Sequence, residues 1–318
     1  MASILIIETV PRAKNPIDAH VRNALTFKTE LEAKGHLVDL LFIQEHSGRY
    51  QKKYDVIFVS YATQYPFIHE IDKIEEHNKD TPWGWITNEY NLRPNAFAYT
   101  IFKRRRSFLL CNYELGSVKF ACFDSEYSVN LNPLLFKLMP ISKKTHDFIY
   151  YGTYRPDREV YFKKYFTEQV YLSTSTKNHK KFLHIGCKSK PIKKFGWDKP
   201  ALQAFRYSLY IEDTFTHNHF NNLANRYYES LACRCVLLFD KSCETTLKKA
   251  GITNYKPFLI ESAKDFARFT KDNYEELLAI QADWREKVVQ ERKEIIQSIE
   301  NVINTELSIL SKSTEAKV

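Results

Sequence analysis

Two arginines lie at a predicted turn that joins a strand to a helix in the second half of the chain. The segment 147–158 reads DFIYYGTYRPDR, in which Gly152 permits a tight turn and Pro156 suits the first turn of a helix. Arg155 and Arg158 then flank the start of that helix. Guanidinium groups bind phosphate oxygens in bidentate fashion, so this turn is a candidate diphosphate site. The alternative is a surface turn with solvated arginines.

A third arginine lies three residues before a glutamate in the segment 225–232, NRYYESLA, which precedes an apolar run that ends at Asp240. A spacing of three places Arg226 and Glu229 on one face of a helix. A carboxylate there can accept hydrogen bonds from both hydroxyls of a ribose, while the arginine binds phosphate beside it. The alternative is an Arg/Glu pair on a solvent-exposed helix face, which contributes only about 0.2–0.5 kcal/mol to stability.

Composition limits the classes of protein to which the chain can belong. Its 318 residues suggest two domains, and a hydrophobic fraction of 44% excludes disorder as the main state. No apolar run approaches the ~18 residues that span a bilayer, and the first residues do not resemble a secretory signal. The six cysteines match no zinc or redox spacing, so we expect reduced thiols and a cytoplasmic location. A net charge of +9 favours a polyanionic partner, for which DNA, RNA, a nucleotide and anionic lipid are all candidates.

Several common phosphate and metal motifs are absent from the sequence. It contains no GxGxxG fingerprint, no GxxxxGK[ST] loop, no GxSxG elbow and no HExxH pair. With only 8 glycines, a glycine-rich phosphate loop is not expected, and side chains and helix starts must hold any phosphate. An Asp-x-Asp pair is also absent, so no metal ligand is predicted.

The periodicity of apolar residues predicts alternating strands and helices in two series. The first series consists of strands at 3–8, 38–43, 55–61 and 83–87 and helices at 17–34 and 66–79. The second consists of strands at 147–153, 168–173, 181–187, 208–213 and 236–240 and helices at 156–166 and 221–232. Such alternation predicts an α/β fold with two largely parallel sheets that face each other across a cleft. The expected domains are 1–140 and 141–275, followed by a helical segment 276–318 that packs back across them.

Taken together, the two arginine motifs resemble the nucleotide-binding half of the DNA β-glucosyltransferases of T-even bacteriophages. These two-domain enzymes of the GT-B fold transfer glucose from UDP-glucose to 5-hydroxymethylcytosine in duplex DNA. The family pattern D-x-I-Y-x-G-x-[FY]-R matches residues 147–155, and R-x-[WY]-E-x-[ML]-A matches residues 226–232. The resemblance implies that the sugar nucleotide is bound by Gly152, Tyr154, Arg155, Arg158, Asp213, Arg226 and Glu229. Arg158 stands one position early for the family's second arginine, and an insertion that helps to hold uracil is missing after Trp197.

The first half resembles the family more weakly. In the family, an aspartate after the strand that resembles 85–87 acts as general base, whereas this chain has Asn88 and Glu89 there. Glu89 is therefore the candidate base, because a carboxylate must remove the hydroxymethyl proton of the acceptor. Asp18 and His20 are the alternatives, although such residues are more often helix caps or surface residues.

Basic runs in both halves favour DNA as the partner. The predicted DNA-binding residues are Arg93, Lys103, Arg104, Arg105, Arg106, Lys188 and Lys190. Phosphate contacts of this kind give sequence-independent affinity, and the target base must be flipped out of the duplex. The alternative is that each run is a solvated surface that aids solubility.

These observations lead to one hypothesis and two alternatives. We expect a monomeric phage enzyme of the infected host cytoplasm that transfers glucose or a pentose such as arabinose from a UDP-sugar to a 5-hydroxymethylated pyrimidine, with inversion. The resemblance implies that such DNA modification serves restriction evasion, and a divalent cation (Mg²⁺ or Mn²⁺) is compatible with it. The alternatives are a GT-B transferase with a non-DNA acceptor and a catalytically silent DNA-binding relative.

Overall fold

The protein consists of two compact α/β units. The computed structural model describes residues 1–8, 19–42, 47–60, 68–87, 105–111, 123–192, 202–212 and 223–315. Unit 1 comprises Met1–Leu135 together with Glu291–Val318, and unit 2 comprises Phe136–Gln290. The chain thus passes between the units after Leu135 and again inside the last helix, after Gln290.

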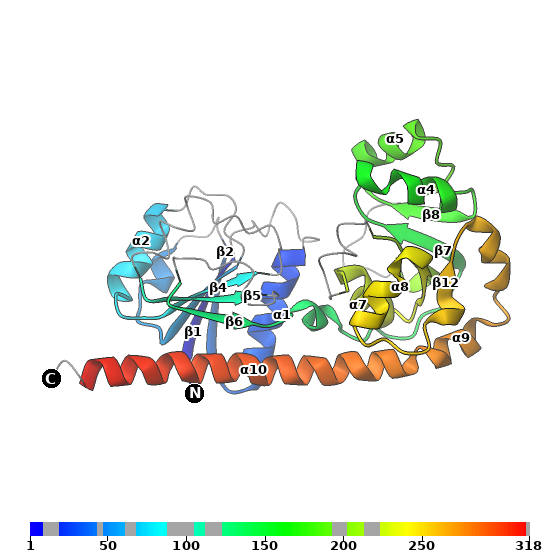
Figure 1. Ribbon diagram of the computed structural model, residues 1–318. Coiled ribbons are helices and arrows are strands. Elements are labelled where there is room, and N and C mark those ends of the chain that lie inside the picture. The colour runs from blue at the N-terminus through cyan, green and yellow to red at the C-terminus, as the bar shows by residue number, and fades with distance from the viewer. Residues whose placement is uncertain are drawn as a thin grey trace. The chain divides into compact units, whose positions relative to one another are not determined.

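Unit 1 is built on a parallel sheet of six strands in the order β2-β1-β3-β4-β5-β6 (Figure 1). Its strands are β1 (Ser3–Glu8), β2 (Leu37–Phe42), β3 (Val56–Ser60), β4 (Trp83–Thr87), β5 (Ser107–Cys111) and β6 (Ser125–Ser128). Helices α1 (Ala19–Ala33) and α2 (Ile68–His77) and short helical turns at Ser47–Tyr50 and Asn132–Leu135 complete it. The first four strands were predicted to within one or two residues, whereas β5 and β6 were not predicted.

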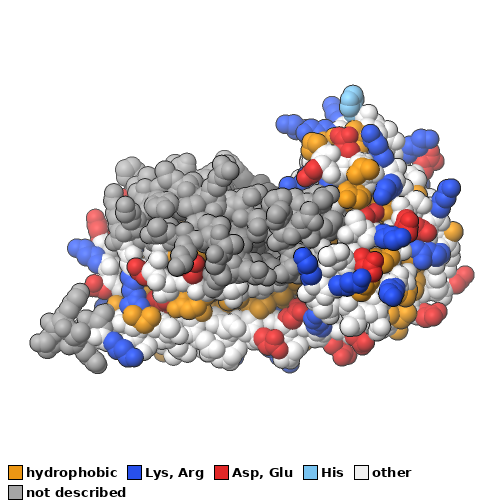
Figure 2. All heavy atoms as spheres, viewed as in Figure 1, with side chains coloured by type: hydrophobic (Ala, Val, Ile, Leu, Met, Phe, Trp, Pro, Cys, Tyr) orange, Lys and Arg blue, Asp and Glu red, His pale blue; other side chains and the backbone are white. Residues whose placement is uncertain are grey.

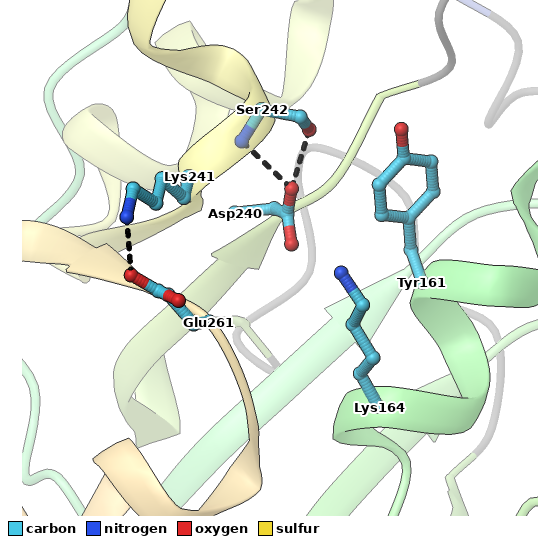
Figure 3. A pocket seen from close by; sticks show the side chains of 6 residues that line it. All are labelled: Tyr161, Lys164, Asp240, Lys241, Ser242 and Glu261. Atoms are coloured by element: carbon cyan, nitrogen blue, oxygen red, sulfur yellow. Dashed lines mark hydrogen bonds and ion pairs between the residues drawn. The ribbon is translucent and has the colours of Figure 1, made fainter.

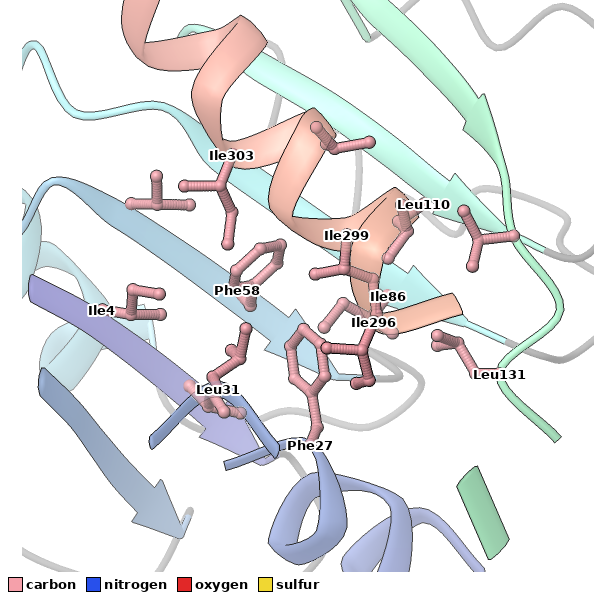
Figure 4. Close-up of a cluster of buried hydrophobic side chains, with 14 of the residues drawn as sticks. Ile4, Phe27, Leu31, Phe58, Ile86, Leu110, Leu131, Ile296, Ile299 and Ile303 are labelled. Atoms are coloured by element: carbon pink, nitrogen blue, oxygen red, sulfur yellow. The ribbon is translucent and has the colours of Figure 1, made fainter. Parts of the chain in front are cut away.

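Alternation along the strands gives unit 1 a core on each face of its sheet. Ile4 and Ile6 of β1 pack with α1 on one face, where α10 (Ala282–Glu315) contributes Ile299 and its neighbours (Figure 4). The intervening Leu5 and Ile7 pack with α2 on the other face. A period of two along a strand sends successive side chains to opposite faces, which is why both layers are apolar.

A buried polar contact ties α10 to the edge of the same sheet. Glu306 of α10 is 1% exposed, and its Oε1 accepts a hydrogen bond of 2.7 Å from the hydroxyl of Tyr127. Burial and this bond raise the pKa of Tyr127 to about 12, so the phenol remains a donor at neutral pH. The other carboxylate oxygen of Glu306 lies 3.0 Å from Nη2 of Arg106. These contacts explain how the end of the chain becomes part of the first unit.

Unit 2 has a second parallel sheet, in the order β12-β11-β10-β7-β8-β9. Its strands are β7 (His146–Tyr151), β8 (Val170–Ser173), β9 (Lys190–Ile192), β10 (Phe205–Tyr210), β11 (Val236–Asp240) and β12 (Leu259–Ile260). The helices are α4 (Glu159–Tyr165), α5 (Thr176–His184), α7 (Asn225–Ala232), α8 (Glu244–Lys249), α9 (Tyr274–Ile280) and the start of α10. Short helical turns lie at Pro156–Arg158, Leu202–Ala204, Lys241–Cys243, Lys256–Phe258 and Ala263–Arg268. Phe148 and Tyr150 of β7 pack with aromatic side chains of the α4 side, and Tyr151 points to α7.

The strand predicted at 181–187 is wrong, because these residues belong largely to helix α5. Ser175 caps this helix by accepting a hydrogen bond from the backbone N–H of Asn178. Only Phe182 of α5 is buried, so the short apolar run around it is not a half-buried strand. The strand of this region is β9, which begins three residues after Cys187.

Candidate functional site

The connectivity of the second sheet defines where a ligand would bind in unit 2. From β7 the chain moves outward to β8 and β9 and then returns to β10 on the other side of β7. The carboxyl ends of β7 and β10 therefore form a topological switch point, which is where open α/β sheets bind their ligands. Gly152 follows β7 there, and Glu212 follows β10.

A buried cluster of two arginines and one glutamate occupies this switch point. Glu212 is 2% exposed, and its two carboxylate oxygens bind different guanidinium groups. Its Oε2 lies 2.6 Å from Nη2 of Arg158, and its Oε1 lies 2.7 Å from Nη1 of Arg226. Two positive charges and one negative charge leave the cluster with one net positive charge, which favours an anionic ligand nearby.

Arg226 is held by more than its ion pair. Its Nη1 also donates to the carbonyl of Ile211, its Nε donates to the carbonyl of Tyr151, and its Nη2 lies 3.4 Å from the hydroxyl of Tyr150. The guanidinium stacks 4.8 Å from the centre of the Tyr150 ring. Burial lowers the pKa of Arg226, but Tyr150 and Glu212 raise it, and the net shift is upward. Arg226 is therefore held in place as a fixed positive charge.

Gly152 allows Arg226 to approach the end of β7. Its φ of +152° is rarely adopted by residues with a side chain, and a Cβ at this position would lie 3.1 Å from Nη2 of Arg226. Its N–H donates to the carbonyl of Ser173, which fixes the turn against β8. Both the backbone and the space around it thus require glycine here.

Arg155 is the exposed cation of this site. It precedes the helical turn Pro156–Arg158, and no side chain caps that turn. The neighbouring Tyr154 donates a hydrogen bond to Glu159, and Lys181 lies over its ring. Of the three predicted arginines, Arg155 is therefore the one whose side chain faces solvent, while Arg158 and Arg226 are buried beside Glu212.

Helix α7 places Glu229 one turn after Arg226, as predicted. Glu229 is 9% exposed, so the alternative interpretation of an Arg/Glu pair on a solvated helix face does not hold. The helix is fixed against the sheet by the hydroxyls of Ser230 and Ser208, which lie 2.9 Å apart. A buried carboxylate on this helix is suited to accept hydrogen bonds from sugar hydroxyls.

A polar recess lies at the carboxyl ends of β11 and β12, beside α4 (Figure 3). It measures about 570 Å³ and is lined by Tyr161, Lys164, Asp240, Lys241, Ser242 and Glu261. Asp240 is 2% exposed, and it accepts hydrogen bonds from the N–H of Ser242 and from the hydroxyl of Tyr165 in α4. Burial and this bond raise the pKa of Tyr165. Asp240 thus anchors α4, whose N-cap residue is Arg158.

The first sheet has a switch point of its own, and it carries a glutamate that the sequence analysis missed. From β1 the chain passes to β2 on one side and to β3 on the other, so the ends of β1 and β3 meet there. Glu8 ends β1, is fully buried and lies in register with Ser60 of β3. Its alternation with Ile6 places it on the α1 side of the sheet. An acidic residue at the end of an apolar strand is the signal that could have identified it.

Two of the predicted DNA-binding arginines of unit 1, Arg105 and Arg106, are engaged within the protein. Arg105 is 9% exposed, forms an ion pair with Glu75 and lies 4.7 Å from the centre of the Trp83 ring. Arg106 is paired with Glu306, as described above. This part of the predicted basic run is therefore not a solvated surface. In unit 2, by contrast, Lys188 and Lys190 are exposed.

Several predicted residues lie outside the described part of the chain. They are Asp18, Asn88, Glu89, Arg93, Lys103, Arg104 and Asp213. The candidate base therefore stays a prediction, whereas Glu212, next to Asp213, supplies the acid at the end of β10. Within the described ranges, no group of three His, Cys, Asp or Glu side chains could hold a metal ion. No helix of those ranges has the length and apolar character needed to cross a membrane.

Comparison with known proteins gives a match at the level of fold. No protein-family model matches the sequence, and no curated protein matches it. Among solved structures, the protein is similar to an alpha-glucosyltransferase in complex with UDP and a 13-mer DNA containing an HMU base, with a TM-score of 0.66 and 11% identity over 93% of this chain and 99% of that chain.

Two further structures share the fold. Anabaena Alr3699/HepE in complex with UDP and glucose has a TM-score of 0.54 and 11% identity, and the match covers 96% of this chain and 100% of that chain. AviGT4, a glycosyltransferase involved in avilamycin A biosynthesis, has a TM-score of 0.58 and 12% identity, with 97% and 98% covered. The predicted fold class is confirmed: the chain has the fold of GT-B glycosyltransferases, with two Rossmann-like α/β units and a long C-terminal helix.

Proposed function

We propose that this protein is a UDP-sugar-dependent glycosyltransferase that modifies a 5-hydroxymethylated pyrimidine in double-stranded DNA. The observation that carries the proposal is the Arg158–Glu212–Arg226 cluster at the switch point of unit 2, beside the exposed Arg155. A fold that glycosyltransferases share supports it, as does a neighbour solved with UDP and DNA.

The donor half of the reaction depends on the charge of this cluster. Arg155 is proposed to contact the diphosphate directly, because its side chain is exposed at the site. Arg158 and Arg226 provide the fixed positive charge behind it, and Glu229 accepts hydrogen bonds from the ribose hydroxyls. As the bond between the anomeric carbon and the phosphate oxygen breaks, its electron pair remains on UDP, whose growing negative charge the arginines stabilise.

The acceptor half requires a base on unit 1. The hydroxymethyl oxygen loses its proton to a carboxylate as it forms the new bond to the anomeric carbon. Glu89 is the proposed base, with Asn88 beside it and Asp18 as the alternative. The target base must leave the helix stack to reach the donor, because its substituent is otherwise enclosed in the duplex. Inversion is the proposed stereochemical course, and the anomeric configuration of the product tests it.

The direct test is mass spectrometry of nucleosides after the protein is incubated with DNA and a panel of UDP-sugars. The duplexes carry hydroxymethylcytosine, hydroxymethyluracil, an already glycosylated base or no modification. We expect one hydroxymethylated duplex to gain one sugar, glucose or a pentose, and the unmodified duplex to gain none. Arg155→Ala should depress turnover far more than DNA affinity, whereas Lys256→Ala, which changes another exposed cation of unit 2, should leave both unchanged.

Two other functions give different results in the same assay. A GT-B transferase with a non-DNA acceptor would release UDP from a UDP-sugar without modifying any duplex. The similarity in fold to AviGT4, a glycosyltransferase of avilamycin A biosynthesis, supports this second candidate. A silent DNA-binding relative would bind duplex DNA in a salt-sensitive manner and release no UDP. Either result would contradict the proposed reaction.

A further inference from the structure

Helices α4 and α5 and the start of β9 carry an unusual share of the positive charge of the chain. Residues 159–192 contain seven lysines and two glutamates, which gives +5 in 34 residues, compared with +9 for all 318. All seven lysines are exposed. We call this set the lysine face: it consists of Lys163, Lys164, Lys177, Lys180, Lys181, Lys188 and Lys190.

The elements that carry the lysine face pack directly against one another. The ring of Phe182 in α5 lies 4.9 Å from that of Phe162 in α4. The backbone N–H of Lys188 donates to the carbonyl of Phe166, at the end of α4. The space-filling view shows lysine and arginine side chains over this part of unit 2, as over the rest of its visible face (Figure 2). Six of these lysines therefore belong to one continuous region of the unit, whereas Lys190, in register with Tyr171, projects from the other side of edge strand β9.

Within α5 the basic residues follow the helical repeat. Lys177, Lys180, Lys181 and His184 are spaced i, i+3, i+4 and i+7, so they form one stripe, and Phe182 lies on the opposite side and is the buried residue of the helix. Seven residues of helix span about 10 Å, which is comparable to the distance covered by about three successive phosphates of one DNA strand.

The charges of this face are not neutralised within the described part of the protein. Lys163 has Glu159 at 3.9 Å, whereas no ion pair involves Lys177, Lys180 or Lys188 in the described ranges. Lys181 and Lys190 instead lie over the rings of Tyr154 and Tyr171, at 5.4 and 5.7 Å. These cations remain available to an external polyanion.

We propose that the lysine face, with the α5 stripe at its centre, is where the phosphate backbone of duplex DNA binds to unit 2. This inference rests on the proposed DNA acceptor and adds the residues of α4 and α5 to the predicted Lys188 and Lys190. A membrane surface fits less well, because Phe182 of α5 is turned into the protein and Leu183 is the one large apolar side chain that this helix exposes, too little to enter a lipid layer.

The test is fluorescence anisotropy of a labelled hydroxymethylated duplex over a range of salt concentrations. The variant Lys177→Gln/Lys180→Gln/Lys181→Gln should reduce the slope of log K against log salt by about 2–3, because each phosphate contact contributes about 0.9. The control Lys256→Gln/Lys264→Gln/Lys271→Gln removes the same charge from exposed positions elsewhere in unit 2 and should keep the wild-type slope. Far-ultraviolet circular dichroism of both variants should match that of the wild type, which shows that unit 2 is folded.

The outcomes separate this inference from the proposed function. The proposal that DNA binds to the lysine face is wrong if the α5 variant keeps the wild-type salt slope, or if the control variant shows an equal reduction of that slope. In either case, sugar transfer to DNA by the wild-type protein would still support the proposed reaction. If the wild-type protein binds no duplex and transfers no sugar to one, both proposals fail together.

Discussion

Glu212 holds two arginines that are far apart in the sequence. Arg158 and Arg226 each bind one of its carboxylate oxygens, and the three side chains are almost fully buried. The two guanidiniums repel each other, since Arg158 acts to lower the pKa of Arg226. The carboxylate between them is therefore what allows two buried positive charges to lie at the end of one sheet.

Removing the charge of Glu212 should destabilise unit 2. We expect Glu212→Gln to lower the free energy of unfolding by about 3 kcal/mol, because breaking a buried ion pair leaves the partner charges uncompensated. Urea denaturation of the two proteins measures this difference. Asp147→Asn is the matched control, since Asp147 pairs with Arg206 at 2.7 Å but is half exposed, and its loss should cost less than about 1 kcal/mol. Equal effects of the two changes would contradict the role of Glu212.

Gly152 offers a test of the geometry around Arg226. Gly152→Ala should lower both stability, by about 1 kcal/mol, and affinity for UDP, because the new methyl group forces the guanidinium to move. Gly35→Ala is the control: Gly35 ends α1 with φ +86°, and a Cβ there meets no atom within 4 Å. It should cause a similar loss of stability and leave UDP affinity unchanged, as measured by calorimetry. A similar change in UDP affinity in both variants would argue against a site at Gly152.

The sequence allowed the residue types of the site to be predicted better than their contacts. Arg155, Gly152 and Glu229 could be proposed as candidates because turns, helix starts and helical spacing are local properties, and their roles stay predictions. Glu212 was not predicted, because the pairing of β10 with β7 is what brings its carboxylate to Arg158 and Arg226. Such a contact depends on pairing between distant strands, which no local pattern contains.

Among the elements, α10 supplies several buried side chains to the core of unit 1, although most of unit 1 lies in the first part of the chain. Its Ile299 is fully buried between α1 and the sheet, so Ile299→Ala should lower the free energy of unfolding by about 2–5 kcal/mol. Ile309→Ala is a control of the same residue type on the same helix, because Ile309 is exposed, and it should have little effect. Chemical denaturation checks both variants, and equal stability of the two would show that α10 does not form part of this core.

Helices α5 and α10 show why some elements were harder to predict than others. The apolar stripe of α10 recurs over many turns, so a long terminal helix was expected, although its division between two units was not. In α5 only one side chain, a phenylalanine, is buried, so the apolar residues of this helix show almost no helical periodicity. The short apolar run around residue 183 was therefore interpreted as a strand. The segment forms a helix because Ser175 caps its first turn and because its lysines can all remain exposed to solvent.

At the scale of the whole molecule, the alternation of strands and helices was sufficient to predict two parallel α/β units. The alternating Ile and Leu of β1 and the restart of the pattern at β7 are strong periodic signals. Strand β6 was missed because it is short and polar, with the sequence SEYS. The C-terminal segment packs against unit 1 and not unit 2, and this choice depends on long-range packing, which a sequence pattern does not specify.

Calorimetric titration with UDP shows whether the arginines at the ends of β7 and β10 bind a sugar nucleotide. The account predicts saturable binding of one UDP by the wild-type protein and about tenfold weaker binding by Arg155→Ala, because a hydrogen bond to a charged group contributes about 1.5–3 kcal/mol. Lys256→Ala should bind as the wild type does. A wild-type protein that gives no saturable binding, or an Arg155→Ala variant with unchanged affinity, would contradict it.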